Sequence, residues 1–420
     1  MNDLYKISSN DKVLYKTPYS FDVSVWELFW ANWYGASLII AKPDGHKDTD
    51  YMQKIIQEQL ITIMHFVPSM LEVFLNSLQS HSLNIKHVFC SGEELTTRQL
   101  KKCHESLPNS QVHNLYGPTE TSIDVLFYDC NYSSLDTVYI GKPIANINAY
   151  VLDSGLKPLP IGAIGELYIG GVGLGRGYLG KSGFTAEKFI ASPFQAGARL
   201  YKTGDLACWT EDGNLQYLGR NDFQVKIRGF RVELGEIEEA ISGFAGVKQV
   251  VVLALDKKEG DGDSKYLVGY YVADVRLNED SMLAYLETRL PKYMLPSRLV
   301  YLESLPVTMN GKLDRKELPE PVLIDESSYV APRNEMEVRM CEIWADILRL
   351  PVEQIGIHDD FFKLGGNSIL VITLVNKLRR EFKDLEIYVF YIFEYSSICR
   401  LSKYLKTKNN VTSYHKKVKI

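Results

Sequence analysis

Residues 114–121, Asn-Leu-Tyr-Gly-Pro-Thr-Glu-Thr, are the most informative stretch of this chain. The polar and apolar residues that lead into them predict a short strand, which the Gly-Pro pair ends with a turn. Tyr116, Thr119 and Glu120 are thereby displayed at a strand end, where ligands bind in open α/β sheets. The ring suits a base, the hydroxyl a phosphate oxygen and the carboxylate a hard cation. An ordinary turn explains the octapeptide equally well, so the rest of the chain has to decide.

The composition is that of a globular protein with large cores. The chain has 420 residues, of which 45% are hydrophobic and 24% charged, and its net charge is −5. This length predicts roughly three domains. The charge gives no reason to expect a nucleic-acid partner, and six scattered cysteines without a CxxC pair suggest neither a zinc site nor a disulfide scaffold. We expect a cytoplasmic protein with free thiols.

The same reading predicts no membrane partner. The N-terminus is polar and has no apolar signal region. The most apolar stretch, Val25 to Ala41, is short for a membrane span and is interrupted by polar residues and a glycine. We therefore predict that it forms a buried helix and strand.

Strands and helices alternate through the first third of the chain, which argues for a parallel α/β sheet. From 137 to 220 the pattern changes to short strands with Gly and Pro turns, which indicates a smaller, mostly antiparallel sheet or barrel. The predicted elements of the first part are helix 51–59, strand 61–66, a helix opened by Pro68-Ser69, strand 85–91, helix 94–106 and strand 111–116.

A GxGxxG match at Gly175–Gly180 suggests a dinucleotide site at first sight. No βαβ unit surrounds the match, and three further glycines stand in front of it. We interpret these residues as loop glycines.

The second half of the chain predicts two further domains. A helix over 233–243, strands over 247–254 and 266–273 and a helix over 280–290 make a compact α+β unit. Beyond a Pro-, Ser- and acid-rich linker, a helical domain begins near residue 335. In it Met340, Trp344, Ile347 and Leu348 share one helical face.

Nine stretches resemble the adenylation-plus-carrier part of a nonribosomal peptide synthetase, of the adenylate-forming superfamily. They stand in the family's order, and the resemblance runs from about Val13 to Leu405. The matching stretches are YSFDVSVWE, SGEEL, NLYGPTET, GELYIGGVGLGRGYLG, YKTGD, GRNDFQVKIRGFRVELGEIE, LPKYMLP, NGKLDR and DDFFKLGGNSIL.

The resemblance implies an α/β and α+β multidomain fold. The adenylation part would consist of a truncated large subdomain over 1–221, with an α/β sheet and a small β-barrel-like region, and a small α+β C-terminal subdomain over 222–317. A linker over 318–332 would lead to a four-helix carrier bundle over 333–406. A basic, disordered tail would follow over 407–420. The family's Gly/Ser/Thr-rich loop ending in Pro-Lys-Gly, which cradles the ATP β- and γ-phosphates, has no counterpart before the FDVS stretch. We therefore expect a truncated or split synthetase.

The resemblance also implies ATP, Mg²⁺ and 4′-phosphopantetheine as cofactors. Lys312 would bridge the substrate carboxylate and the α-phosphate, Glu120 would bind Mg²⁺, and Thr119 would contact phosphate. Asp222 matches the family's hinge. Ser368 matches the site to which a phosphopantetheinyl transferase adds the arm of coenzyme A. The nucleotide-binding residues would be Gly92, Glu93, Asn114, Tyr116, Gly117, Asp205 and Arg220.

Several of these residues also have an ordinary structural interpretation. Asp205 follows a glycine and suits a turn. Lys312 alone would be a solvated surface charge. Asp22 and Ser368 each precede or begin a helix-like run, so each suits a helix N-cap.

The residues that match the family's selectivity positions predict the substrate. Asp22 would pair with an α-ammonium group, and the bulk of Trp26 and Phe89 leaves room for a small side chain. Polar residues in an otherwise apolar pocket favour a hydroxyl, so serine is expected and threonine is the runner-up. The full set is Asp22, Val23, Trp26, His65, Phe89, Ser91, Leu115, Ile123, Asp124 and Lys312.

Two functional hypotheses stay open. The chain is a serine-activating half that works with a separate N-terminal piece or with neighbouring synthetase modules. Alternatively, it is a catalytically incomplete remnant whose carrier is loaded in trans.

Overall fold

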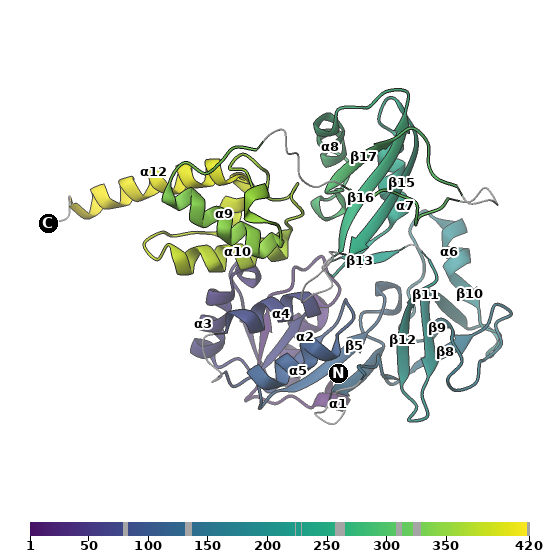
Figure 1. The fold of residues 1–420 in the computed structure, drawn as a ribbon. Helices are drawn as coiled ribbons and strands as arrows, with labels where there is room; N and C mark the ends of the chain where they lie inside the picture. Colours follow the sequence, from purple (N-terminus) through teal and green to yellow (C-terminus); the bar gives the residue numbers. More distant parts are fainter. Residues whose placement is uncertain are drawn as a thin grey trace. The chain divides into compact units, whose positions relative to one another are not determined.

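The computed structural model describes residues 1–78, 83–130, 137–222, 224–227, 229–256, 265–307, 313–321 and 329–417, with side chains in the last helix described as far as residue 408. The chain forms two compact units, Met1–Gly229 and Phe230–Ile420 (Figure 1). No helix among the described residues is long and apolar enough to cross a bilayer.

The first unit is built on a seven-stranded sheet in the order β2-β1-β3-β4-β5-β6-β7. The five strands from β2 to β5 run parallel, and β6 and β7 are antiparallel additions at one edge. The parallel α/β prediction is thus confirmed. The strands are β1 Lys12–Tyr15, β2 Ser37–Ile40, β3 Ile63–Phe66, β4 His87–Cys90, β5 Gln111–Tyr116, β6 Leu126–Cys130 and β7 Lys142–Pro143.

Helices cover both faces of this sheet, because successive side chains of a strand point to opposite faces. On one face Met64, Val88 and Val112 share a core with α3, α4 and α5. On the other face Phe89 and Leu115 pack with α1 and α2. These elements are α1 Asn2–Tyr5, α2 Ser24–Tyr34, η1 Gly45–Lys47, α3 Thr49–Gln59, α4 Pro68–Ser77, α5 Thr97–Ser106 and η2 Thr119–Thr121.

Val25 to Ala41 form a helix and a strand, as predicted, but the prediction that both are buried is wrong. Phe29 and Trp33 on α2 stack with ring centroids 5.7 Å apart, yet Trp33 is 75% exposed. Ile40 on β2 is 66% exposed. The apolar composition of the stretch did not reveal that only the Trp26 and Trp30 side of α2 faces the sheet.

A second, antiparallel sheet completes the first unit, as predicted for 137–220. Strands β10, β11, β9 and β8 lie in that order, and β12 pairs with β11 (Figure 1). Its elements are β8 Ile147–Leu152, β9 Gly165–Gly171, α6 Ser182–Lys188, β10 Phe189–Ala191, β11 Arg199–Trp209 and β12 Leu215–Arg220, followed by the short β13 Val225–Ile227.

The second unit begins with an α+β part. Strand β15 pairs antiparallel with β16, and β16 pairs parallel with β17. This agrees with the predicted order of helix, two strands and helix. The elements are β14 Phe230–Val232, α7 Leu234–Ser242, β15 Val247–Asp256, β16 Lys265–Ala273, α8 Glu279–Glu287, η4 Lys292–Met294 and β17 Arg298–Leu302.

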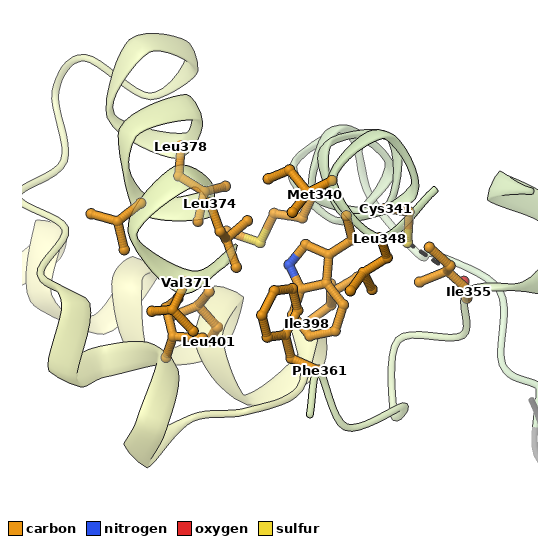
Figure 2. Close-up of a cluster of buried hydrophobic side chains, with 14 of the residues drawn as sticks. Met340, Cys341, Leu348, Ile355, Phe361, Val371, Leu374, Leu378, Ile398 and Leu401 are labelled. Carbon is orange, nitrogen blue, oxygen red and sulfur yellow. Dashed lines mark hydrogen bonds between the residues drawn. The ribbon is translucent and has the colours of Figure 1, made fainter. Parts of the chain in front are cut away.

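The carrier part follows as four described α-helices around one core. Figure 2 shows side chains of this core. Trp344 is fully buried, and its ring lies 4.9 Å from that of Phe361 in an edge-to-face arrangement. The predicted face of Met340, Trp344, Ile347 and Leu348 is buried throughout. The elements are α9 Glu335–Leu348, η6 Val352–Gln354, α10 Ser368–Glu381, α11 Val389–Glu394 and α12 Ile398–Lys417.

The C-terminal tail departs from its prediction. Helix α12 continues to Lys417, so the expectation of a disordered tail from residue 407 is wrong for 407–417. Leu401 and Leu405 anchor the first half of this helix in the carrier core. That anchored half provides a nucleus from which the helix can extend.

We predict that Trp344→Ala weakens the carrier selectively. Removing a fully buried indole costs about 3–5 kcal/mol, because the cavity it leaves cannot fill. Hydrogen exchange of peptides from α9, α10 and α12 in the full chain should accelerate, and peptides from β3 to β5 should not change. Phe390→Ala is the matched control, since Phe390 is 58% exposed. Equal exchange in the two variants would contradict this account of the core.

Candidate active site

The candidate site lies at the carboxyl ends of three parallel strands. His65 and Phe89 are near the ends of β3 and β4, Ser91 directly follows β4, and Tyr116 closes β5. The strand period of two places His65, Phe89 and Leu115 on the face that α2 covers. Three separate segments of sequence therefore meet under one helix.

The predicted substrate-pocket residues come together here. His65 Nε2 lies 2.9 Å from Ser91 Oγ, and the Trp26 ring packs edge-on against His65 and Phe89, with centroids 5.9 and 5.4 Å away. Val23, Leu115 and Ile123 belong to the same apolar cluster. Lys312, the tenth predicted residue and the predicted catalytic lysine, lies outside the described residues.

Several buried polar atoms of this pocket lack a hydrogen-bond partner within the described part of the chain. They are Trp26 Nε1, His65 Nδ1 and Asp124 Oδ2. A buried polar atom without a hydrogen bond costs on the order of 1–3 kcal/mol. The Trp26 indole lies close enough to Asp124 to stabilise its carboxylate, so His65 Nδ1 is the group with no hydrogen-bonding neighbour of its own among the described residues. Together the three groups give the pocket the polar lining that a site for a polar ligand requires.

The titratable groups of the pocket are shifted towards their neutral forms. Burial, together with the charge of Asp22, raises the pKa of Asp124 to about 7, although the nearby Trp26 indole offsets part of the shift. Burial, assisted by the nearby Lys16 ammonium, lowers the pKa of His65 well below its usual value. At neutral pH His65 is therefore uncharged, and Asp124 is poised between carboxylic acid and carboxylate.

The alternative role of Asp22 as a helix cap is wrong. The residue before α2 is Val23, and no side chain caps the helix. Asp22 Oδ1 instead accepts a bond of 2.9 Å from the Val23 amide. Its carboxylate is half-buried beside the pocket, and its charge contributes to the shift at Asp124.

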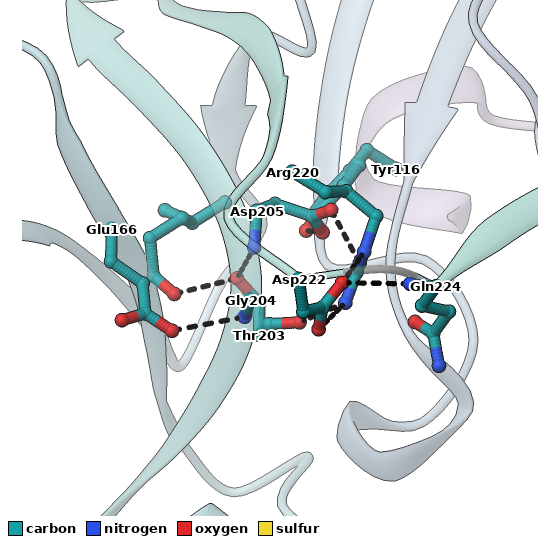
Figure 3. Close-up of polar contacts among 9 residues, drawn as sticks. Tyr116, Glu166, Thr203, Gly204, Asp205, Arg220, Asp222 and Gln224 are labelled. Atoms are coloured by element: carbon teal, nitrogen blue, oxygen red, sulfur yellow. Dashed lines mark hydrogen bonds and ion pairs between the residues drawn. The ribbon is translucent and has the colours of Figure 1, made fainter. Parts of the chain in front are cut away.

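A hydrogen-bonded group joins the two sheets of the first unit (Figure 3). The Tyr116 hydroxyl donates to Asp205 Oδ2, and Arg220 Nη1 donates to Asp205 Oδ1 at 2.6 Å. The same guanidinium donates to both oxygens of Asp222 at 2.7 Å and to the Thr203 carbonyl. Asp205 is therefore a fixed, buried acceptor, and not the simple turn residue of its alternative interpretation.

The predicted hinge residue Asp222 is held by that pairing. Burial alone would raise its pKa, but the bidentate bond with Arg220 lowers it. The carboxylate therefore stays charged near neutral pH. Its role as a hinge stays a prediction.

Other predicted nucleotide-binding residues surround the same strand end. Asn114 Nδ2 donates to the Tyr139 carbonyl at 2.8 Å, while Asn114 Oδ1 is buried without a partner among the described residues. A Cβ at Gly117 would lie 1.9 Å from the Ile123 carbonyl oxygen, so only glycine fits. Ile123 itself has φ 76°, a strained value for a β-branched residue.

The side chain of Glu93 accepts from the Ser69 amide at 3.0 Å and from the Gly229 amide at 2.7 Å. Glu93 thus ties the start of α4 to the end of the first unit. The role predicted for its backbone, lining the nucleotide together with Gly92, stays a prediction.

The Thr119-Glu120 turn projects from the end of β5. Thr119 is exposed, and Glu120 Oε1 accepts a bond of 2.6 Å from the Tyr178 hydroxyl. Tyr178 and Lys226 were not predicted from the sequence for this site. Lys226 Nζ lies 5.7 Å from the centre of the Tyr116 ring. Tyr178 stands inside the GxGxxG match and inside the stretch GELYIGGVGLGRGYLG that carries the family resemblance, and these motifs are the signals by which it could have been found.

The predicted modification site is accessible. Ser368 is the first residue of α10 and is exposed. Asn367 caps the helix, since its Oδ1 accepts from the Ile369 and Leu370 amides at 3.0 Å. The interpretation of Ser368 as the N-cap is therefore wrong, because Asn367 caps the helix and the Ser368 hydroxyl does not. A Cβ at Gly366 would lie 2.4 Å from the Phe361 carbonyl oxygen, so the turn before Ser368 requires glycine.

Comparison with known families agrees with this arrangement. Three family models match the chain. They are described as AMP-binding enzyme, over residues 1–179, AMP-binding enzyme C-terminal domain, over 236–312, and phosphopantetheine attachment site, over 338–405. Fold and matches together define an adenylate-forming region followed by a carrier domain.

Named relatives make the assignment more specific. The chain is 41% identical over 406 residues to tyrocidine synthase 3 of Brevibacillus parabrevis, covering 96% of this chain and 6% of the relative. It is 44% identical over 382 residues to phosphinothricin tripeptide synthetase PhsB of Streptomyces viridochromogenes, covering 88% and 31%. The chain thus spans less than a third of the length of either relative.

A solved structure shares the fold. It is holo-PA1221, an NRPS protein containing adenylation and PCP domains, and it matches with a TM-score of 0.76 at 24% identity, covering 95% of this chain and 66% of that one. The identities to the two synthetases decide the family. The chain belongs to the nonribosomal peptide synthetases.

We predict that Asp124→Asn changes how stability depends on pH. The folded-state pKa of about 7 lies above the ordinary value of 3.8. The protonated carboxyl therefore favours folding fully below pH 3.8, and this contribution disappears as pH rises through 7. Asparagine stays neutral, so the variant should gain stability relative to wild type from pH 5 to 8, by at most about 1.4 kcal/mol per pH unit.

The measurement is the thermal unfolding midpoint of both proteins at each pH. Asp212→Asn, which removes an exposed carboxylate, controls for the loss of one charge. A difference between wild type and Asp124→Asn that stays constant with pH would contradict the shifted pKa.

Proposed function

We propose that this chain activates an amino acid, serine in particular, as its aminoacyl adenylate and passes it to a phosphopantetheine arm on Ser368. The observation that carries the proposal is the convergence at one sheet edge. His65 near the end of β3 has an unmatched buried atom, Asp205 is bonded to Tyr116 at the end of β5, and the Thr119-Glu120 turn follows that same strand. Substrate, nucleotide and phosphate contacts would then share one site.

In the first half-reaction, a carboxylate oxygen of the amino acid attacks the α-phosphorus of ATP, and pyrophosphate leaves. Catalysis here requires the reacting groups to be positioned and the developing charge to be neutralised. Lys312 would supply the ammonium between carboxylate and α-phosphate. Asp205, supported by Arg220, would accept from the ribose hydroxyls, since each carboxylate oxygen has more than one lone pair.

The adenine contacts follow from the same geometry. Asn114 Oδ1 is a buried acceptor without a partner among the described residues, which suits the exocyclic amino group of adenine. The ring of Tyr116 would stack on the base. The close approach that Gly117 permits and the turn at Gly92 would let the backbone line the nucleotide.

A magnesium ion fits the residues present. Mg²⁺ in phosphoryl-transfer sites is held by one or two carboxylates together with substrate phosphates and water. Glu120 offers the carboxylate, on a turn that also carries the hydroxyl of Thr119. Bound there, the cation would neutralise charge on the phosphates.

The unmatched atoms favour serine. Asp22 would pair with the α-ammonium group, and Trp26 with Phe89 limits the side chain to a small one. A substrate hydroxyl could satisfy His65 and Asp124 together with Ser91, which a methyl group could not. Threonine, with one more methyl beside Phe89, remains second.

The second half-reaction uses the carrier. Ser368 would hold the phosphopantetheine arm, whose thiol would supply the acceptor for the aminoacyl group as AMP leaves. Ser368 fits the attachment, because its hydroxyl is exposed and the helix is capped by its neighbour. The partners would be a phosphopantetheinyl transferase with coenzyme A, and neighbouring synthetase modules or a separate N-terminal adenylation piece, all in the cytoplasm.

A second candidate function is a carrier that is loaded in trans. The observation that favours it is the carrier core, which is closed around Trp344 by residues that all lie beyond position 335. The amino-acid-activating function additionally requires that the pocket of the first unit bind an amino acid. The two hypotheses agree on Ser368 and differ on amino-acid binding.

Ser368 should accept one phosphopantetheine arm. Incubation of the full chain with a phosphopantetheinyl transferase and coenzyme A should add a single arm by intact-mass spectrometry. Ser368→Ala should gain nothing, and Ser396→Ala, another serine of the carrier, should gain as much as wild type. Equal mass gain in wild type and Ser368→Ala would refute the attachment site.

The first unit should prefer a seryl over an alanyl adenylate mimic. Calorimetry with seryl- and alanyl-sulfamoyl adenosine measures binding without requiring turnover. We expect the seryl compound to bind about tenfold more tightly, since one matched buried polar group contributes about 1–1.5 kcal/mol. Asp124→Ala should narrow this ratio, whereas Asp22→Ala should weaken both compounds alike.

The outcome that would overturn the serine assignment is tighter binding of a large apolar or acidic analogue. A seryl-to-alanyl ratio unchanged by Asp124→Ala would also overturn it. If neither compound binds to a chain that still accepts the arm at Ser368, the carrier-in-trans function is favoured.

A further inference from the structure

The glycine-rich segment 170–180 has no role in the function described so far. It leaves β9, reaches α6 and packs against the turn that carries Glu120. The Gly175 amide donates to the Glu120 carbonyl at 2.8 Å, and the Ser122 hydroxyl donates to the Gly173 carbonyl at 2.6 Å. The segment thus contacts the turn on both sides of Thr121.

Close backbone approach explains the glycines of this segment. A Cβ at Gly173 would lie 2.6 Å from the Thr121 carbonyl oxygen, and one at Gly175 would lie 3.2 Å from the Glu120 carbonyl oxygen. Both obstacles are backbone atoms, so no flexible side chain could move aside. Of the GxGxxG glycines, Gly175 packs against this turn, whereas a Cβ at Gly177 would meet the Thr185 side chain and one at Gly180 would have no atom within 4 Å.

The segment also brings a side chain to Glu120. The Tyr178 hydroxyl donates to Glu120 Oε1 at 2.6 Å. A carboxylate can only accept a hydrogen bond, so the Tyr178 hydroxyl is the donor. A carboxylate that receives such a bond loses rotational freedom.

Tyr178 is itself held in place by α6 and β10. Its ring packs against Phe184 and Phe189, with centroids 4.6 and 5.8 Å away, and its amide donates to Thr185 Oγ1 at 2.9 Å. Arg199 on β11 donates to the Gly175 and Arg176 carbonyls at 2.9 Å each. The hydroxyl therefore has a fixed position relative to the turn.

We propose that Tyr178 is a positioning residue that orients the Glu120 carboxylate for a divalent cation, with the glycine-rich segment as its frame. This inference rests on the proposed function, in which Glu120 binds the cation. Ligating carboxylates need such outer hydrogen bonds, and losing one weakens metal affinity by roughly 10–100-fold. If the Tyr178–Glu120 hydrogen bond only supported the fold, its loss would weaken nucleotide binding equally with and without metal.

The test is Tyr178→Phe in the full chain, with Mn²⁺ as the spectroscopic probe, because Mn²⁺ accepts the same oxygen ligands as Mg²⁺. Electron paramagnetic resonance measures Mn²⁺ bound in the presence of ATP, and calorimetry measures AMP bound without metal. Phenylalanine keeps the ring contacts with Phe184 and Phe189. We expect Mn²⁺ affinity to fall roughly tenfold and AMP affinity to stay unchanged.

Tyr168→Phe is the matched control. It removes a hydroxyl from another tyrosine–glutamate pair of the first unit, in which Tyr168 on β9 donates to Glu166 Oε2 at 3.3 Å. A second pair of variants tests the frame. Gly173→Ala meets the Thr121 carbonyl and should weaken Mn²⁺ binding, whereas Gly183→Ala has no atom within 4 Å of its new Cβ and should not.

Glu120→Ala separates this inference from the function on which it rests. If Glu120→Ala loses Mn²⁺ and Tyr178→Phe binds it like wild type, the positioning role is wrong and the cation site stands. If Glu120→Ala binds Mn²⁺ like wild type, both fall. If Tyr178→Phe weakens AMP and Mn²⁺ to the same extent, Tyr178 only supports the fold and the inference is overturned.

Discussion

The hydrogen-bonded group of Tyr116, Asp205 and Arg220 is the constraint on which the candidate site depends. Tyr116 ends a strand of the parallel sheet, whereas Asp205 and Arg220 belong to β11 and β12 of the antiparallel sheet. A buried carboxylate is tolerated only when it is paired, so breaking either bond would leave a buried charge without compensation. The cost of that charge holds the two sheets in a fixed relation. The Thr119-Glu120 turn and the glycine-rich segment from β9 can then meet between them.

The pocket beside this group shows the opposite pattern of hydrogen bonding. At the sheet junction every oxygen of Asp205 has a donor, while around Trp26, His65 and Asp124 buried atoms lack partners among the described residues. Most buried polar atoms in native proteins are satisfied. The contrast within one unit distinguishes Asp205, which is bonded within the fold and has only its remaining lone pairs to offer a ligand, from pocket atoms whose hydrogen bonds are still open.

The sequence predicted periodic features well and contacts across the chain poorly. Strand β9, Gly165–Gly171, coincides with the GELYIGG pattern, and the carrier face around Trp344 is buried as its helical spacing required. The burial of α2 was wrong because composition cannot say which side of a helix meets a sheet. The caps at Asp22 and Ser368 were wrong because a neighbouring residue took the position. Tyr178 was missed because it meets Glu120 only through tertiary packing, over 58 residues of sequence.

The two carboxylates of the pocket make substrate charge part of its electrostatics. The pKa of Asp124 is raised in part by the negative charge of Asp22. On the proposed function, an α-ammonium group bound at Asp22 would cancel that repulsion, so the pKa of Asp124 would fall when substrate binds. The same linkage requires that an ionised Asp124 strengthen ammonium binding. Recognition of the backbone of an amino acid and recognition of its side chain would thus be coupled by charge alone, although the two carboxylates lie far apart in the sequence.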